Sequence, residues 1–300
     1  MSSERNFILS IDIGGANCKI GRVGPEGNVA GFESYPTARI REGGVDNFID
    51  ILNNHTDKYS IEGIALALPA TVDWEHNHVR SQCAEVPWLE EAVNKRKMED
   101  ELHLPVRFVN DVEALLVGEW FWGELKGMNS GVVISLGESM GSALLWDGEP
   151  QQGRRGSIME LEHVSLETFG KEMEGLPPGS SSNWLSGQGL REHLNDKCVD
   201  CTLKELFEGD DEEIQEIQEE FEFRLAHLLG TVVMMLDPER LVLTGGLTAS
   251  YDSWFSGVKE KMDNYVMEQF QGLPAVMLGQ LRGEEVVKGP AAFWDWRQKQ

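Results

Sequence analysis

Residues 7–31 read FILSIDIGGANCKIGRVGPEGNVAG, and residues 131–153 read GVVISLGESMGSALLWDGEPQQG. In each stretch an apolar strand leads into a turn that contains glycine, a second apolar strand follows, and another glycine turn comes after it. This order is typical of a β-hairpin with glycine in its turns. Because the same unit returns after roughly half of the chain, the sequence predicts a duplicated α/β domain.

Helical and strand patterns alternate through the rest of the chain. Residues 212–236 place apolar side chains at the spacing of one helix face, and Asp237-Pro238 ends the pattern. A very apolar helix is expected at about residues 112–122. Further strands are expected at three short apolar runs: residues 61–68, 106–109 and 240–243. Strands that alternate with helices indicate an α/β fold.

The composition limits the class of partner. The 300 residues include 26 Lys and Arg against 51 Asp and Glu, a formal net charge of −25. Nucleic-acid binding needs a basic surface, so we expect no nucleic-acid partner. No apolar run approaches the ~20 residues that cross a bilayer, and four cysteines are too few for a disulfide scaffold. The sequence therefore predicts a cytoplasmic protein without a membrane partner.

The motif Asp12-Ile-Gly14-Gly15 follows the first expected strand. Glycines let a ligand approach the backbone, whose N–H groups then bind phosphate oxygens, and an Asp at a strand end holds Mg²⁺ through water. A tight hairpin with an Asp at the edge of the core explains the same residues equally well. The second glycine hairpin, at Gly137, favours a phosphate-binding role.

Asn110-Asp111 stands between an expected strand and the apolar helix. Asn and Asp are both common helix N-caps, and the local sequence by itself favours that structural role.

Glu160-Leu-Glu162-His163 forms a third polar motif. In an extended segment Glu160 and Glu162 share one face and His163 lies on the other, whereas in a tighter turn Glu160 and His163 converge. Glu and His exchange hydrogen bonds with vicinal sugar hydroxyls. An exposed acidic strand with a solvated His is the alternative, which the stretch alone favours slightly.

Taken in this order, the three motifs resemble the ROK family of sugar kinases, members of the actin-like ATPase superfamily. Residues 10–17 are similar to the family's first phosphate motif, and residues 104–119 are similar to the segment with its catalytic base. The resemblance implies that Asp111 is the base, and that the sugar is bound by Asn110, Glu160 and His163. It covers nearly the whole chain and is glucokinase-like.

The same resemblance implies the nucleotide site. Residues 137–142 fall at the family's second phosphate motif, residues 243–246 resemble the segment beside the adenosine, and residues 289–292 match a closing Gly-Ala-Ala motif. Mg²⁺ is expected to be held by Asp12 through water. The implied cofactor-binding residues are Asp12, Gly14, Gly15, Gly137, Glu138, Ser139, Gly141, Gly245 and Gly246.

A fold and a reaction follow from the resemblance as well. It implies two duplicated actin-like (ribonuclease H-like) domains with an active-site cleft between them. We expect residues 1–109 with a C-terminal helix at 286–300 in one domain, and residues 110–285 in the other. The expected reaction transfers a phosphoryl group from ATP, or from polyphosphate, to a hexose hydroxyl, with O6 as the first choice. Because members of the family often form dimers, a homodimer is expected as well.

The sequence departs from the family pattern at three places. Residues 164–187 contain no Cys where the family has its zinc motif, so no zinc site is expected. Ser182 falls near the family's third sugar-binding Glu. Glu138 replaces a Thr beside the phosphates, where like charges repel; its carboxylate points away, helps to hold Mg²⁺, or weakens nucleotide binding. The alternative function is therefore a sugar-binding protein of this fold that no longer phosphorylates.

Overall fold

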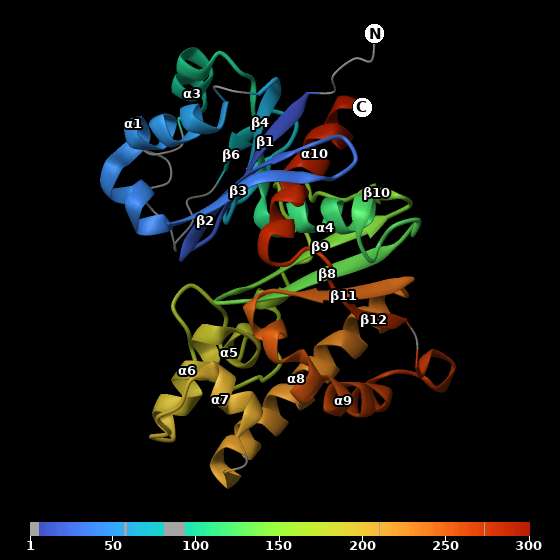
Figure 1. The fold of residues 1–300 in the computed structure, drawn as a ribbon. Coiled ribbons are helices and arrows are strands. Elements are labelled where there is room, and N and C mark those ends of the chain that lie inside the picture. The colour runs from blue at the N-terminus through green and yellow to red at the C-terminus, as the bar shows by residue number, and fades with distance from the viewer. Residues whose placement is uncertain (1–5, 57–58, 81–93, 210, 273) are drawn as a thin grey trace. The chain divides into compact units, whose positions relative to one another are not determined.

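The computed structural model describes residues 6–56, 59–80, 94–209, 211–272 and 274–300 (Figure 1). The chain divides into two compact units. Unit 1 comprises Met1–Gly127, Pro150–Ile158 and Gln280–Gln300, and unit 2 comprises Met128–Glu149 and Met159–Gly279.

Unit 1 is built on a mixed sheet with the strand order β3-β2-β1-β4-β7. Strands β1 and β2 form the expected antiparallel hairpin, whereas β1, β4 and β7 run parallel. The strands are β1 (Phe7–Ile13), β2 (Asn17–Val23), β3 (Val29–Pro36), β4 (Ile61–Leu68) and β7 (Val106–Asn110). A separate two-stranded ribbon pairs β5 (Val72–Asp73) with β6 (His78–Val79).

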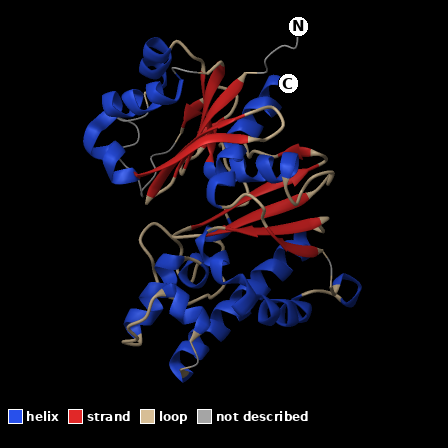
Figure 2. Ribbon diagram, viewed as in Figure 1, coloured by secondary structure: helices blue, strands red, loops and turns tan. Residues whose placement is uncertain are grey.

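Helices cover both faces of this sheet (Figures 1 and 2). They are α1 (Thr37–Thr56), α3 (Lys95–Leu102), α4 (Asp111–Trp122) and α10 (Lys288–Gln298), the last preceded by the 3₁₀ turn η5 (Gly283–Val287). Alternate residues of a strand point to opposite faces. Leu9 and Ile11 accordingly pack with the side chains of α1, whereas Ile8 packs with Trp294 of α10.

Unit 2 is built on a second mixed sheet with the order β10-β9-β8-β11-β12. Its strands are β8 (Gly131–Leu136), β9 (Met140–Trp146), β10 (Glu149–Pro150), β11 (Arg240–Thr244) and β12 (Ala275–Leu278). Its helices are α5 (Ser182–Leu185), α6 (Gly187–Asp196), α7 (Leu203–Glu208), α8 (Glu212–Leu236) and α9 (Tyr251–Met262). Short 3₁₀ turns are η1 (Leu161–His163), η2 (Gly246–Ser250), η3 (Asp263–Tyr265) and η4 (Glu268–Phe270).

The two sheets repeat one topology, which confirms the duplication predicted from the sequence. In each sheet an antiparallel hairpin is followed by a third strand at one edge and by two parallel strands on the other side. The predicted helix at 212–236 is α8, with its bounds as expected.

The helix α4 lies in unit 1, whereas residues 110–285 were expected in the other domain. The reason is a close backbone contact between α4 and α10. A Cβ at Gly289 would stand 2.7 Å from the carbonyl oxygen of Ala114, and a Cβ at Gly118 would collide with Leu281. Glu119 also ties α4 to the segment that precedes α10, since its Oε1 accepts a hydrogen bond from the N–H of Leu281 at 2.8 Å. The segment Pro150–Ile158 also belongs to unit 1.

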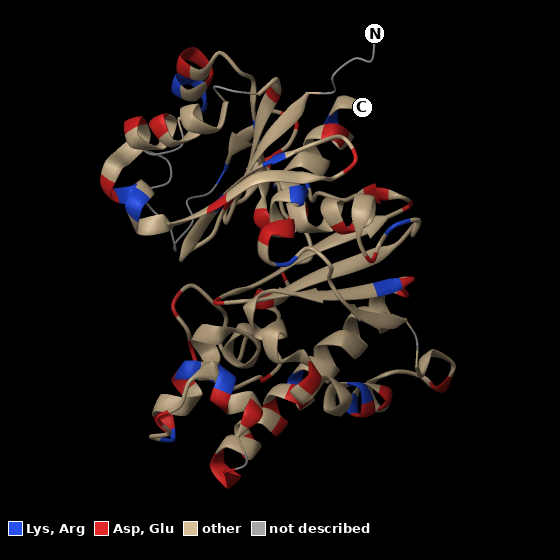
Figure 3. Ribbon diagram, viewed as in Figure 1, with Lys and Arg blue, Asp and Glu red and all other residues tan. Residues whose placement is uncertain are grey.

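The first half of α8 is strongly acidic (Figure 3). Ile214 and Ile217 are buried there, while Glu212, Glu213 and Glu216 are exposed. Such a face is a solvated, solubilising surface. Among the described residues we find no helix with both the length and the apolar character needed to cross a bilayer.

Candidate active site

In unit 1 the expected site residues lie at the carboxyl ends of the parallel strands. Asp12 is next to the last residue of β1 and is in register with Ala67 of β4, whose Leu68 is in register with Asn110 of β7. The Gly14-Gly15 turn follows β1 directly, and the N–H of Gly14 donates to the carbonyl of Asn17 at 3.0 Å. The carboxyl edge of parallel strands is where open α/β sheets bind ligands.

Asp12 faces a lysine that the sequence reasoning did not single out. Lys19 is its cross-strand neighbour in the hairpin, and its Nζ lies 3.5 Å from Oδ2 of Asp12. Burial raises the pKa of the Asp12 carboxyl above its usual value, and the charge of Lys19 opposes this shift only in part. A partly buried carboxylate that Lys19 stabilises only in part suits further positive charge, as Mg²⁺ would supply. The pairing of residues across the expected hairpin is the sequence signal that could have identified Lys19.

Asn110 is the N-cap of α4. Its Oδ1 accepts hydrogen bonds from the N–H groups of Val112 and Glu113 at 3.0 and 3.1 Å, and its Nδ2 donates to the carbonyl of Ala70 at 3.3 Å. Asp111 is half-buried in the first turn, where its Oδ1 accepts from the N–H of Val112 at 2.9 Å. The positive end of the helix dipole favours a charged carboxylate at this position. Asn110 is thus a helix cap, and Asp111 stands directly after it in the first turn of α4.

Glu113, two residues along α4, is an acid that the sequence reasoning left unnoticed in an apolar helix. Its side chain is 7% exposed. Oε2 accepts a hydrogen bond from Nε1 of Trp74 at 2.8 Å, and Oε1 accepts from Nε2 of Gln152 at 3.3 Å. Burial raises the pKa of Glu113 to about 8, against the effect of these hydrogen bonds.

This raised pKa predicts a pH-dependent stability. Between pH 4.5, the ordinary value, and about 8, the folded protein holds a proton on Glu113 that the unfolded chain has released. The free energy of unfolding therefore falls as pH rises through this window, by up to about 1.4 kcal/mol per pH unit from this group. Glu113→Gln is expected to flatten the slope in denaturant unfolding curves recorded at several pH values across the window. Parallel slopes for the two proteins would contradict the assignment.

In unit 2 the two expected phosphate-side segments come together at the carboxyl ends of β8 and β11. Thr244 of β11 is in register with Ser135 of β8, so Gly245 follows its strand beside Leu136. Gly245 has a positive φ of 93°, and a Cβ there would stand 2.5 Å from the carbonyl oxygen of Leu136. Glycine is required at this place by both the backbone conformation and the close approach.

The β8–β9 turn carries the unusual Glu138. The N–H of Gly137 donates to the carbonyl of Ser139 at 3.0 Å, and Gly141 continues into β9 in register with Ser135. The carboxylate of Glu138 forms an ion pair with Arg191 of α6. The N–H of Gly187 donates to the carbonyl of Gly137 at 2.7 Å, which fixes the start of α6 to this turn. The carboxylate of Glu138 is therefore directed at a cation of the protein.

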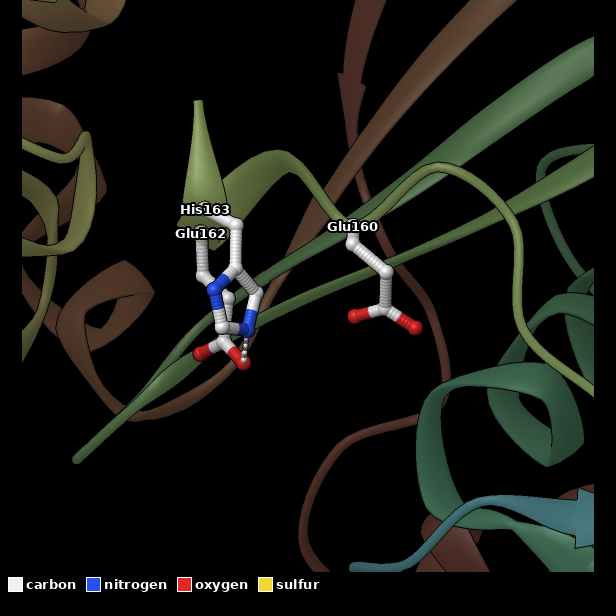
Figure 4. A group of neighbouring side chains, drawn as sticks. All are labelled: Glu160, Glu162 and His163. Carbon is white, nitrogen blue, oxygen red and sulfur yellow. Dashed lines mark ion pairs between the residues drawn. The ribbon is translucent and has the colours of Figure 1, made fainter. Parts of the chain in front are cut away.

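Glu160, Glu162 and His163 converge in a tight turn, the second of the two expected geometries (Figure 4). Leu161 is buried and anchors the 3₁₀ turn η1. One side-chain ligand atom from each of the three polar residues lies within 4.8 Å of the others, and Nε2 of His163 is 3.4 Å from Oε1 of Glu162. Ser142 of β9 donates a hydrogen bond to the carbonyl of Met159, which ties the turn to the second hairpin. The arrangement suits hydrogen bonding to a polyhydroxylated ligand.

The loop after His163 is held by side chains. Trp184 stacks on His193 with ring centroids 3.6 Å apart, and the guanidinium carbon of Arg224 lies 4.3 Å from the centroid of the Trp184 ring. Ser181 donates to the carbonyl of Leu161. The bond from Ser181 ties the polar turn to the segment that leads into α5.

Comparison with known proteins supplies an independent finding. The sequence model described as the ROK family matches residues 8–297. A glucokinase of Halalkalibacterium halodurans is 22% identical over 292 residues, covering 88% of this chain and 87% of its own. A ROK family protein from Streptococcus pneumoniae, solved with sucrose, has a TM-score of 0.84 at 20% identity and covers 98% of this chain and 99% of its own. A ROK family glucokinase from Streptomyces griseus, solved with glucose and AMPPNP, has a TM-score of 0.79 at 20% identity, with 96% and 98% covered. These likenesses confirm the expected fold.

Proposed function

Because the chain belongs to the ROK family, we propose that it is a sugar kinase that transfers a phosphoryl group from ATP to a hexose hydroxyl, with Asp111 as the base. The observation that carries this proposal is the place of Asp111. It stands in the first turn of α4, at the same sheet edge as Asp12 and the Gly14-Gly15 turn. A positioned carboxylate beside a phosphate-binding turn is what a phosphotransferase requires.

In the proposed reaction, Asp111 accepts the proton of the attacking hydroxyl, O6 of the sugar, as that oxygen bonds to the transferred phosphorus. Asn110 keeps α4 and Asp111 in orientation and is proposed to contact the sugar together with Glu160 and His163. Because these three bear different hydrogen-bonding groups, they distinguish the orientations of ring hydroxyls.

The phosphate side is assigned to the two glycine hairpins and to Gly245-Gly246. Backbone N–H groups at such turns bind phosphate oxygens and stabilise the charge of the transition state. Asp12 is proposed to hold Mg²⁺ through water, since its partly buried carboxylate suits added positive charge. Mg²⁺ bound with the donor supplies charge neutralisation at the phosphates.

A coupled assay tests the proposal directly. The protein is incubated with glucose, fructose, mannose or N-acetylglucosamine, each with ATP-Mg²⁺ or polyphosphate, and phosphorylated sugar is measured. Phosphorylation of at least one hexose is expected, with glucose the first probe because two of the relatives are glucokinases. Calorimetry with sugar alone separates the rival. Sugar binding without transfer from either donor would support the non-catalytic sugar-binding protein, which the acidic Glu138 motivates.

Arg191 gives a test of the donor side. Arg191→Ala removes the partner of Glu138 and leaves an unpaired carboxylate at the phosphate turn. An exposed charge of this kind changes binding by ~1 kcal/mol, so we expect the KM for the donor to rise about fivefold while the KM for sugar is unchanged. The Arg191→Ala, Glu138→Ala double variant should regain the original donor KM.

The matched control for Arg191 is Lys197→Ala. Lys197 follows the same helix and pairs with Glu216, so its removal changes the net charge equally, at another place. Equal effects of the two single variants on donor KM would exclude a local role for the Glu138–Arg191 pair.

A further inference from the structure

We propose that Glu113, held by Trp74 and Gln152, is a positioning residue that fixes the base-bearing first turn of α4 for phosphoryl transfer. The inference rests on the proposed function, and it adds three residues to the machinery of Asp111. It is carried by the hydrogen bonds of a buried carboxyl group.

The Glu113 side chain is joined to the rest of unit 1 by a closed set of hydrogen bonds. Trp74 Nε1 and Gln152 Nε2 each donate to one carboxyl oxygen of Glu113, at 2.8 and 3.3 Å. Gln152 Nε2 also donates to the carbonyl of Val72 at 2.7 Å, and Gln152 Oε1 accepts from the N–H of Trp74 at 3.4 Å. Two separate parts of unit 1 therefore bind the carboxyl group: Trp74, which follows β5, and Gln152, which lies in the segment Pro150–Ile158.

The donor Trp74 is itself fixed. Its ring packs against Phe293 and Trp296 of α10, with centroid separations of 5.5 and 5.2 Å. The indole N–H thus has a defined direction, and rotation or translation of the first turn of α4 would break its bond to Glu113. Trp74 therefore holds the start of α4 in place, as residues that support a reacting group do.

The backbone of Glu113 connects this restraint to the site. Its N–H donates to Oδ1 of Asn110 at 3.1 Å, so Glu113 closes the cap that orients Asp111. Misplacement of a reacting group by about 1 Å costs up to about 10²-fold in rate. A buried carboxyl group also contributes less to the stability of the fold than an apolar residue of similar size, so its presence indicates a role in function. The hydrogen bonds of Glu113 are arranged to orient Asp111.

The first test removes one hydrogen bond and keeps most of the ring. Trp74→Phe deletes the indole N–H that binds Glu113. The matched control is Trp294→Phe, because the Nε1 of Trp294 is buried without a hydrogen-bond partner among the described residues of the same unit. Both variants lose the same volume, so their difference isolates the bond to Glu113.

We expect Trp74→Phe to lower kcat about tenfold, with the dissociation constant of sugar unchanged by calorimetry, and Trp294→Phe to leave kcat near that of the unaltered protein. Glu113→Leu should lower kcat at least as far as Trp74→Phe. Glu113→Gln keeps one acceptor oxygen for the indole N–H and should therefore retain most of the kcat that Glu113→Leu loses. Circular dichroism confirms that each variant is folded before its kinetics are compared.

The outcomes separate this proposal from the function on which it rests. If the unaltered protein transfers phosphate, but Trp74→Phe and Trp294→Phe lower kcat alike or Glu113→Leu retains full kcat, the positioning role is wrong and the kinase function stands. If sugar affinity falls in parallel with kcat, Glu113 is a structural residue only. If the unaltered protein transfers no phosphate to any sugar from either donor, the proposed function and this inference fail together.

Discussion

Asp111→Asn is expected to lower kcat by about 10²–10⁴-fold and to leave sugar binding nearly intact. The amide has almost the shape of the carboxylate, and its oxygen still accepts the hydrogen bond that the N–H of Val112 donates. It has no basic oxygen for the proton of the sugar hydroxyl. The rate of sugar phosphorylation measures the first effect, and calorimetric titration with the same sugar measures the second.

Asp252→Asn is the matched control. Asp252 is also an acidic residue in the first turn of a helix, α9 of unit 2, and it is exposed. The same chemical change there should leave kcat unaltered. Near-normal turnover in Asp111→Asn would show that Asp111 is not the base. Loss of sugar binding together with turnover would show that its role is in ground-state binding or in structure.

Gly289→Val is expected to destabilise the fold by about 3 kcal/mol or more. A Cβ at Gly289 would stand 2.7 Å from the carbonyl oxygen and 2.8 Å from the carbonyl carbon of Ala114, and both are backbone atoms that cannot rotate away. Relief requires that α10 move off α4, and overpacking of this kind costs about 1–3 kcal/mol for smaller insertions. The shift in the midpoint of denaturant unfolding measures the effect.

A second substitution separates the steric cause from a general effect of glycine replacement. At Gly246 a Cβ would meet no atom within 4 Å, and the residue has no positive φ. Gly246→Ala should therefore leave the unfolding midpoint nearly unchanged, whereas Gly289→Ala should already lower it. If both glycines tolerate alanine equally, the close contact of α4 with α10 does not govern stability.

The sequence pattern predicted the parts of this molecule that depend on neighbours in the chain. The hairpin of β1 and β2 and the helix α8 follow from local periodicity and glycine turns, and they are confirmed. The repeat of residues 7–31 at 131–153 predicted the shared topology of the two sheets, because a repeated unit folds in the same way twice.

Contacts between distant residues could not be predicted in this way. Arg191 is 53 residues from Glu138, and Trp74 is 39 residues from Glu113. Nothing in a local pattern specifies such pairs, because they are set by how helices pack on strands. The same holds for the domain boundary, since α4 joins unit 1 through the backbone contact at Gly289. The closing Gly-Ala-Ala motif at residues 289–292, for which the sequence indicated no role, thus has a packing role here.

The roles of Asn110 and Asp111 show how far local reasoning extends. The sequence offered a helix cap as the favoured local role, and Asn110 is a cap. The proposed catalytic role of Asp111 came from the order of the motifs along the chain, which no local pattern contains.

The division of the chain has a consequence for its biosynthesis. The chain passes between the two units four times, and α10, with its buried Phe293 and Trp294, completes unit 1. Domains often fold in the order of their synthesis, N-terminal first. In this protein the ribosome has to release nearly all of unit 2 before the last layer of unit 1 exists. Until then the N-terminal sheet has one face covered by α4 alone, so chaperone binding to nascent chains should persist until residues 288–298 emerge.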